Sequence, residues 1–493
     1  MDFNFLSTIL FFPAAGAIVI ALLKGRNEKL LKWLAIVFTA VPFILAVYLF
    51  AVFDRSAAGV QFEEYYLWIA PLNAHYHLGV DGLSMPLLLL TTFLGFLAVL
   101  ISWKVHTRAR EFFAWMLLME TSIIGVFVSL DLLLFFVMWE IEVIPMYFLI
   151  AIWGSGRKQY SATKYLIYTL FGSAFMLAGI LALYFTTGSL SMVDIANNGL
   201  AMAQTALPAA AMFWLLFIGF AVKLPMFPLH TWLPDAHTDA PTAVSVMLAG
   251  VLIKMGGYGM LRTVSIFPGP AQEYAQILII LALVGIIYGA AVTLLQTDIK
   301  RMIAYSSISH MGYVLLGIFA LGTISMTGAA LQMFSHGVVT GLLFALAGLV
   351  IHNIKVRDLR QLGGLARQIP VICVLFSIAG LASLGLPLTS GFAAEFLVFL
   401  GAYNSTVVAG MQVYTIIAIA GVVLTAGYIL WILQQAFFGP VKAEFTAVKD
   451  ADGLEKVYSF LLVAVIILVG VYPAVMTDIF KIGVEPIARL FGG

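Results

Sequence analysis

Apolar runs of about 20 residues recur along the whole chain and are separated by short polar loops. A run of this length is what an α-helix needs to cross the hydrocarbon core of a bilayer. The pattern predicts an all-α polytopic membrane protein with about fourteen spanning helices. The predicted spans are 3–23, 30–52, 82–103, 112–130, 132–153, 161–187, 208–228, 241–262, 274–296, 300–320, 324–352, 369–400, 411–438 and 457–480.

The distribution of basic residues tests this count. Of the 25 Lys and Arg residues, 19 lie in the loops on the side of the first predicted loop. The opposite side carries only Arg55, Arg262, Lys481 and Arg489. Lys223 and Lys254 fall inside predicted spans. By the positive-inside rule, the basic loops face the cytoplasm and both termini face away from it.

The composition is typical of a membrane protein and argues against nucleic-acid binding and against a cysteine-based metal site. Hydrophobic residues make up 62% of the chain and charged residues 10%, whereas about a quarter of a soluble domain is charged. A net charge of +1 predicts no nucleic-acid partner. The one cysteine, Cys373, lies in an apolar run and supports neither a disulfide nor a metal site.

Ionisable residues inside the predicted spans are the candidate functional groups. They are Glu120, Glu140, Glu142, Glu395, Lys223, Lys254, His310 and His336. A charge at the bilayer centre costs about 2.5–3.5 kcal/mol on insertion scales, so such residues usually mark ion or proton paths. A static ion pair that holds two helices together is the alternative. It is less favoured here because acids, bases and histidines are spread over several spans.

Depth in the bilayer indicates that these groups form a row. At 1.5 Å per residue, His310 lies about 15 Å beyond Lys300, and Lys254 about 20 Å beyond Pro241. Glu140 lies about 14 Å beyond Asp131 by the same measure. Titratable groups at one depth on separate helices predict a path in the membrane plane rather than a vertical pore.

Two spans carry helix-breaking residues. Pro225, Pro228 and Pro234 follow Lys223 in the seventh span, and Pro387 with flanking glycines interrupts the twelfth, ahead of Glu395. Broken helices at membrane depth line cavities or lie buried in protein. The breaks occupy corresponding positions in two five-helix blocks, which predicts two inverted repeats.

The predicted domain organisation follows from these blocks. It is a three-helix N-terminal segment 1–110, a first repeat 111–265 with spans 4–8, a second, inverted repeat 266–440 with spans 9–13, and a C-terminal loop and last helix 441–493.

The residue types favour proton transfer. A buried lysine loses its proton more readily, and a nearby carboxylate opposes this loss. Histidine titrates near neutrality and relays protons through its two nitrogens. No phosphate-binding loop, dinucleotide fingerprint or cysteine cluster supplies energy in this chain, so the driver must be another protein or an ion gradient.

Three segments resemble a known family. They are FFVMWEIEVIPMYFLIAIWG (135–154), AVKLPMFPLHTWLPDAHTDAPTAVSVMLAGVLIKMGGYGMLR (221–262) and DIKRMIAYSSISHMGYV (298–314). They are similar to the antiporter-like, proton-translocating membrane subunits of respiratory complex I, the NADH–quinone oxidoreductase, and the similarity covers nearly the whole chain. Related proteins include Mrp-type sodium/proton antiporters.

The resemblance implies a role for each residue of the row. Glu140 matches the glutamate of the fifth span, which pairs with the seventh-span lysine, here Lys223. Lys254 matches the lysine that links the two half-channels, and His310 and His336 match histidines of the central polar axis. Glu395 matches the terminal acid of the twelfth span, taken as a proton exit or a contact to another subunit.

Other residues have open roles. Glu142 lies about 200° around the helix from Glu140, so both cannot face one neighbour. It either faces an adjacent subunit or is a protonated, hydrogen-bonded acid. Glu120 is outside the family pattern and is predicted to be structural or protonated. His230, Asp235 and His237 follow the seventh-span break and either funnel protons from the cytoplasm or form cap-and-turn structure.

The resemblance also implies partners and cofactors. It predicts no cofactor in this chain, with FMN, iron–sulfur clusters and quinone in partner subunits that oxidise NADH or ferredoxin. The predicted partners are other membrane subunits of complex I, including two further antiporter-like subunits, in a bacterial inner membrane or another energy-transducing membrane. The rival functions are a subunit of a Mrp-type antiporter or membrane-bound hydrogenase, and a non-conducting scaffold.

Overall fold

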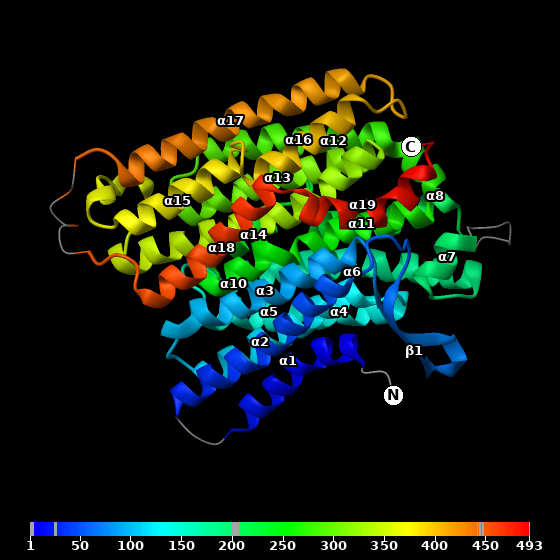
Figure 1. Ribbon diagram of the computed structural model, residues 1–493, viewed down its shortest axis with the longest axis horizontal. Coiled ribbons are helices and arrows are strands. Elements are labelled where there is room, and N and C mark those ends of the chain that lie inside the picture. The colour runs from blue at the N-terminus through cyan, green and yellow to red at the C-terminus, as the bar shows by residue number, and fades with distance from the viewer. Residues whose placement is uncertain are drawn as a thin grey trace.

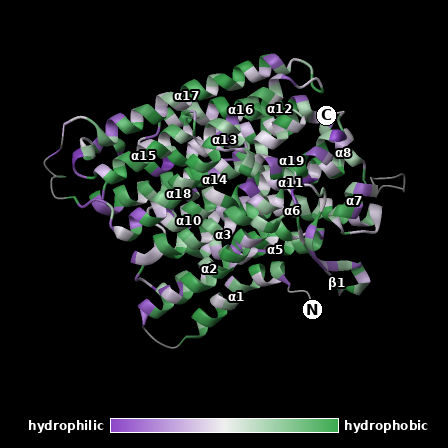
Figure 2. Ribbon diagram, viewed as in Figure 1, coloured by the Kyte–Doolittle hydropathy of each residue, from purple (hydrophilic) through white to green (hydrophobic). Residues whose placement is uncertain are grey.

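Long helices that run roughly parallel to one another make up almost the whole chain (Figure 1). The computed structural model describes residues 4–23, 27–198, 207–440, 442, 445 and 448–492. Within these residues, 12 helices are long and apolar enough to cross a membrane. The predicted all-α polytopic class is therefore confirmed. Apolar residues cover the helices, and hydrophilic ones gather toward the helix ends (Figure 2).

The first part of the chain contains six long helices and a hairpin. Its elements are α1 (Phe5–Leu22), α2 (Glu28–Val52), β1 (Gln61–Ile69), β2 (Ala74–Val80), α3 (Ser84–Ile101), α4 (Ala109–Val128), α5 (Leu132–Trp153), α6 (Lys158–Thr187) and the short α7 (Met192–Asn198). The antiparallel hairpin, in which Tyr66 pairs with Tyr76, lies where the sequence predicted only a loop. It lies at the end of the bundle that also carries α7 and both termini (Figure 1).

The remaining elements build the centre and the opposite edge. They are α8 (Ala209–Lys223), α9 (Trp232–Asp239), α10 (Thr242–Met247), α11 (Lys254–Ile266), α12 (Pro268–Leu294), α13 (Ile299–Phe319), α14 (Thr323–Ile354), α15 (Pro370–Ser383), α16 (Ser390–Tyr403), α17 (Met411–Phe437), α18 (Gly453–Val471) and α19 (Ala474–Arg489). Helices α13 and α14 and the segment 242–266 are almost wholly buried by the others, whereas fewer than half of the residues of α2 and α17 are buried.

Both predicted helix breaks are confirmed. Helix α8 ends at Lys223 and α9 begins at Trp232, with Pro225 and Pro228 between them. Helix α15 ends at Ser383 and α16 begins at Ser390, with Pro387 between them. Proline has no backbone N–H and clashes with the preceding turn, so a helix does not continue through it. The Trp232 indole N–H donates to the freed carbonyl of Val222 at 2.9 Å.

A third irregularity was not predicted from the sequence. The eighth predicted span contains a π-helical turn, Leu248–Leu252, between α10 and α11. Here Gly250 and Gly337 of α14 approach so closely that a Cβ on Gly337 would lie 2.5 Å from the Gly250 carbonyl oxygen. The π turn therefore lies backbone against backbone on α14, immediately before Lys254.

The last predicted span is misplaced. The sequence predicted one helix over 457–480, but α18 ends at Val471 and a second helix, α19, begins after Pro473. Helix α19 packs on the turn before α3, where a Cβ on Gly82 would lie 2.3 Å from the Ile479 carbonyl oxygen. The close contact joins the C-terminal helix to the N-terminal part of the chain.

One local structure occurs twice, in the two predicted repeats. Asp131 caps the N-terminus of α5, and the strand-like segment around it pairs with Ser191, after α6. Asp298 caps α13, and its segment pairs with Asp358, after α14. These are corresponding positions in the two five-helix blocks. The correspondence supports the inverted repeat and the domain boundaries drawn from it, which stay a prediction.

A largely buried ion pair ties α11 to the turn before α3 at the end of the bundle near the termini. The Arg262 guanidinium of α11 donates to Asp81 at 2.7 Å and to the Tyr258 hydroxyl at 3.0 Å. Burial raises the pKa of Asp81, but the Arg262 charge and hydrogen bonds to the carboxylate outweigh it and hold that pKa below its usual range. The stabilisation is therefore present above the unfolded-state pKa and is lost as pH falls through the lower folded-state pKa.

We expect Asp81→Asn to lower the free energy of unfolding by about 3 kcal/mol, because it leaves the Arg262 charge buried without an anion. Thermal unfolding in detergent, followed by reaction of a thiol-sensitive dye with the buried Cys373, measures the change. The matched control is Glu485→Gln, which removes an exposed partner of Arg489 and should change stability by less than about 1 kcal/mol. Equal stability of the two variants would contradict the structural role of Asp81.

Candidate functional site

The first buried charge cluster joins α5, α6 and α8. The Lys223 ammonium, at the last residue of α8, donates to the Glu142 carboxylate of α5 and to the Tyr165 hydroxyl of α6, the latter at 3.1 Å. Tyr165 in turn donates to Glu142 at 2.7 Å. The Glu142 and Lys223 side chains are 0% and 1% exposed. Lys223 also lies 5.4 Å from the ring centre of Trp139.

The contact partner of Lys223 inferred from the resemblance is wrong. Glu142 pairs with Lys223, whereas Glu140 lies within electrostatic range of Lys223 without forming an ion pair with it in the described part of the chain. The reason is helical geometry. Glu140 shares the outer face of α5 with Ile144, four residues later and 53% exposed, and Glu142 lies on the opposite, inner face.

The second cluster lies at the π turn. The Lys254 ammonium donates to the Ala249 carbonyl, which belongs to the π turn, and lies 2.7 Å from His336 Nδ1 of α14. No carboxylate lies in ion-pair contact with Lys254 among the described residues. π turns inside α-helices often mark functional sites because they redirect backbone groups. Here the π turn directs the Ala249 carbonyl toward the Lys254 ammonium.

The row continues through two histidines to the second helix break. The His310 and His336 rings lie 5.4 Å apart, centre to centre. His310 Nδ1 lies 3.2 Å from the Glu395 carboxylate, and Nε2 lies 3.1 Å from Ser383, the last residue of α15. A Cβ on Gly385 would lie 2.9 Å from Glu395, so the carboxylate folds back over the break. Glu395 therefore faces inward and is only 5% exposed.

Buried polar atoms with no hydrogen-bond partner among the described residues lie along the same row. They are Oε1 of Glu140, both ring nitrogens of His237, Nε2 of His336 and Oε1 of Gln332. Buried polar groups in proteins are nearly always satisfied by protein or water. A cavity of about 10 Å³, lined by His310, His336 and Glu395 among others, is at the lower limit for one water. The row can therefore hold water between its side chains.

Of the three residues that follow the first helix break, Asp235 has a structural role, and the roles of His230 and His237 stay open. Asp235 accepts from Lys164 at 2.8 Å and from Arg301 at 3.0 Å, so it ties α9 to α6 and α13. His230 lies 3.3 Å from the Tyr288 hydroxyl. His237 is fully buried and stacks on Phe344 with ring centres 4.6 Å apart.

Glu120 lies apart from the row, where α4 packs on α3. A Cβ on Gly95 would lie 2.4 Å from the Glu120 carboxyl carbon, and one Glu120 oxygen has no hydrogen-bond partner in the described residues. This position fits the structural or protonated role predicted for it.

Sequence reasoning missed the uncharged members of the row. Tyr165, Gln332 and Ser383 each contact a charged or titratable side chain. The signal that marks them is a polar residue inside a predicted span, because such groups need a partner where no bulk water is present. That signal alone does not name the partner.

The fold and the buried row define the class of protein: an integral membrane protein of antiporter-like architecture, with two broken helices flanking a line of titratable side chains. The sequence model of the NADH:quinone oxidoreductase/Mrp antiporter transmembrane family matches residues 129–438, which include every residue of the row. The chain belongs to this family.

Within this family, the chain is similar to curated proteins that are named as one particular subunit of quinone oxidoreductases. The chain is 41% identical to NADH-quinone oxidoreductase subunit M of Rhodobacter capsulatus, over 97% of this chain and 94% of the relative. It is 40% identical to NAD(P)H-quinone oxidoreductase chain 4 1 of Synechococcus elongatus, over 99% and 92%. The resemblance inferred from the sequence motifs is therefore confirmed.

Solved structures of related complexes contain chains with the same fold. A chain of respiratory complex I from Thermus thermophilus with bound NADH superposes with a TM-score of 0.89 at 28% identity, covering 99% of this chain and all of that one. A chain of the Mrp complex from Dietzia superposes with a TM-score of 0.86 at 20% identity and 99% coverage of both, which shows a shared fold.

We expect Tyr165→Phe to lower the free energy of unfolding by about 1.5–3 kcal/mol, because one hydroxyl serves both members of the Glu142–Lys223 pair. Dye reaction at Cys373 during heating measures the loss. The control is Tyr160→Phe on the same helix, whose side chain is 50% exposed and should tolerate the change. Unchanged stability in Tyr165→Phe would mean that the hydroxyl does not support the ion pair.

Proposed function

We propose that the chain is a proton-translocating membrane subunit of a complex I-type enzyme. In this proposal, NADH or ferredoxin oxidation and quinone reduction occur in partner subunits, which hold FMN, iron–sulfur clusters and quinone, and this chain carries protons without redox chemistry of its own. The observation that carries the proposal is the chain of contacts from Lys254 through His336 and His310 to Glu395, at the centre of the bundle.

The chemistry of the row supports proton transfer. A neutral imidazole nitrogen beside the Lys254 ammonium accepts a proton, and the second nitrogen of the ring releases one. His310 stands next in the row, with the Glu395 carboxylate as the final acceptor. Lys223 holds its proton while Glu142 is ionised, and separation of this pair favours release. Charge on each group thus biases the protonation of its neighbour.

Three features favour complex I over the alternatives. Relatives named as complex I subunits are about 41% identical, whereas the Mrp chain shares the fold at 20% identity. A membrane-bound sulfane sulfur reductase chain also shares only the fold, at 24% identity. A scaffold does not need a buried row of titratable groups, since replacing such groups by apolar ones often stabilises a protein.

The proposal extends to partners and orientation. The chain would pack against other membrane subunits, including two further antiporter-like ones, in a bacterial inner membrane or another energy-transducing membrane. The basic loops would face the cytoplasm, so that both termini lie on the opposite side. The outer face of α16 supports a protein contact, since Phe392, Phe396 and Tyr403 expose 37–51% of their surfaces beside the buried Glu395.

We expect Glu142→Gln, in the assembled complex, to reduce proton pumping at least tenfold, because it removes the counter-charge of Lys223. Acidification of proteoliposomes, measured together with electron transfer, gives the result. The matched variant is Glu140→Gln, which changes the same residue type on the outer face of α5 and should retain more pumping. A larger loss in Glu140→Gln than in Glu142→Gln would contradict the pairing seen here.

We expect a photoreactive benzoylphenylalanine at Phe396 to cross-link to another membrane subunit of the native complex. The side chain is 51% exposed and follows Glu395 directly. Mass spectrometry of the adduct identifies the partner. An adduct with lipid alone would show that this face of α16 borders the bilayer.

A further inference from the structure

A vestibule large enough to hold several water molecules lies at the basic-loop end of the bundle, away from the charge clusters described above. It has a volume of about 330 Å³ and lies between the ends of α3, α14 and α18. This is room for about ten water molecules at about 30 Å³ each. Its rim is exposed and includes Lys104, His352 and Asp452, and its floor is formed by Thr242, Ala345 and Gly348.

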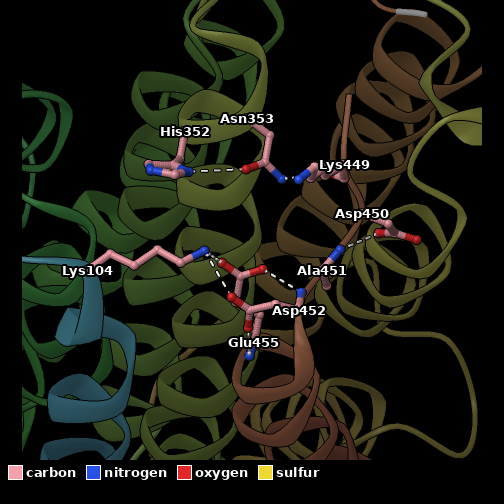
Figure 3. Close-up of polar contacts among 8 residues, drawn as sticks. All are labelled: Lys104, His352, Asn353, Lys449, Asp450, Ala451, Asp452 and Glu455. Atoms are coloured by element: carbon pink, nitrogen blue, oxygen red, sulfur yellow. Dashed lines mark hydrogen bonds and ion pairs between the residues drawn. The ribbon is translucent and has the colours of Figure 1, made fainter. Parts of the chain in front are cut away.

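The rim carries a small acidic cluster (Figure 3). Lys104, at the end of α3, reaches Asp452 at 3.0 Å and Glu455 at 2.6 Å. Two carboxylates and one ammonium leave a local charge of about −1, which attracts hydrated protons and repels anions. Asp452 and Glu455 also cap α18 reciprocally, so the cluster is held in place by the helix N-terminus.

One stripe of α14 connects this vestibule to the buried row. His352, Gly348, Phe344, Thr340 and His336 follow one another at four-residue spacing, so each lies about one turn below the last and about 40° further around the helix. The stripe is about 24 Å long. Its outer end lines the vestibule, and its inner end is the imidazole in contact with Lys254.

An unpartnered histidine lies between the two ends. His237 stacks on Phe344, about 6 Å below Gly348 on the floor of the vestibule. It is fully buried, and neither ring nitrogen has a hydrogen-bond partner among the described residues. Thr340, one turn further in, lies 3.4 Å from His336 Nδ1. A buried imidazole with two unused nitrogens indicates water or a transient proton at this point.

We propose that the vestibule bounded by Lys104, Asp452, Glu455 and Gly348 is the mouth through which hydrated protons reach His237 and then the Lys254–His336 pair. This inference rests on the proposed function. A proton passes from vestibule water to one nitrogen of His237, the other nitrogen releases a proton to water beside Thr340, and His336 receives it. Bulk water replaces the proton taken from the vestibule. Lys104, Asp452 and Glu455 act as positioning residues at the rim.

The floor of the vestibule offers a direct test by chemical block. The native Cys373 is replaced by alanine, and Thr242→Cys, at the half-buried residue of the floor, is introduced in the full complex in proteoliposomes. Methanethiosulfonate reagents are added from the basic-loop side, with the cationic ethyltrimethylammonium form compared with the anionic ethylsulfonate form. The control is Gln361→Cys, an exposed loop position on the same side of the bundle.

We expect Thr242→Cys to react several-fold faster with the cationic reagent than with the anionic one, relative to Gln361→Cys. The modified Thr242→Cys complex should lose at least fivefold in proton pumping, while modified Gln361→Cys pumps normally. No reaction at Thr242→Cys, or full pumping after complete modification, would overturn the proposal. Leu349→Cys, also on the wall of the vestibule, replaces Thr242→Cys if that variant does not assemble.

Two further variants separate this inference from the function it rests on. Glu455→Gln keeps the cap of α18, because glutamine accepts the same hydrogen bond, but removes a rim charge. It should reduce pumping several-fold, and Glu111→Gln, an exposed acid paired with Arg108 on the same side, should not. Lys254→Ala tests the row itself. If Lys254→Ala stops pumping but the blocked vestibule does not, only the mouth is wrong; if neither matters, the proton row is wrong.

Discussion

Every charge placed in the middle of this bundle needs a partner, because hydrocarbon offers none, and this requirement organises the structure. Glu142 forms an ion pair with Lys223, and Glu395 lies against His310. Lys254 is the exception in kind, because a neutral imidazole and a backbone carbonyl, rather than a carboxylate, surround its ammonium. Among the described residues, no carboxylate forms an ion pair with it.

Interruptions of the helices lie beside buried charged side chains of the row. Lys223 ends the helix before the first break, Glu395 folds over the second, and the π turn directs a carbonyl to Lys254. Such interruptions are tolerated because the helices around them bury them. Close packing of glycines on α14 brings the π turn against that helix, so that Lys254 and His336 meet. Irregularity and tight packing thus depend on each other.

The two ends of the central helices differ. At the basic-loop end a vestibule opens between α3, α14 and α18. At the other end, α11 runs about 12 Å from Lys254 to Arg262, whose guanidinium is held by Asp81 and Tyr258. An ion pair closes one side, and the vestibule opens on the other. This asymmetry is the arrangement that a directional proton path requires, because a group open to both sides would let protons leak back.

The sequence by itself determined the membrane class, the two helix breaks and the identity of the buried titratable groups, because hydropathy, proline and charge act locally along the chain. The pairings were decided by tertiary structure. Which of Glu140 and Glu142 meets Lys223 depends on the rotation of α5 against α6 and α8, a difference of about 200° that hydropathy does not record when a span is apolar on all sides. The π turn and the vestibule arise likewise from contacts between segments far apart in the chain, where packing overrides the local pattern.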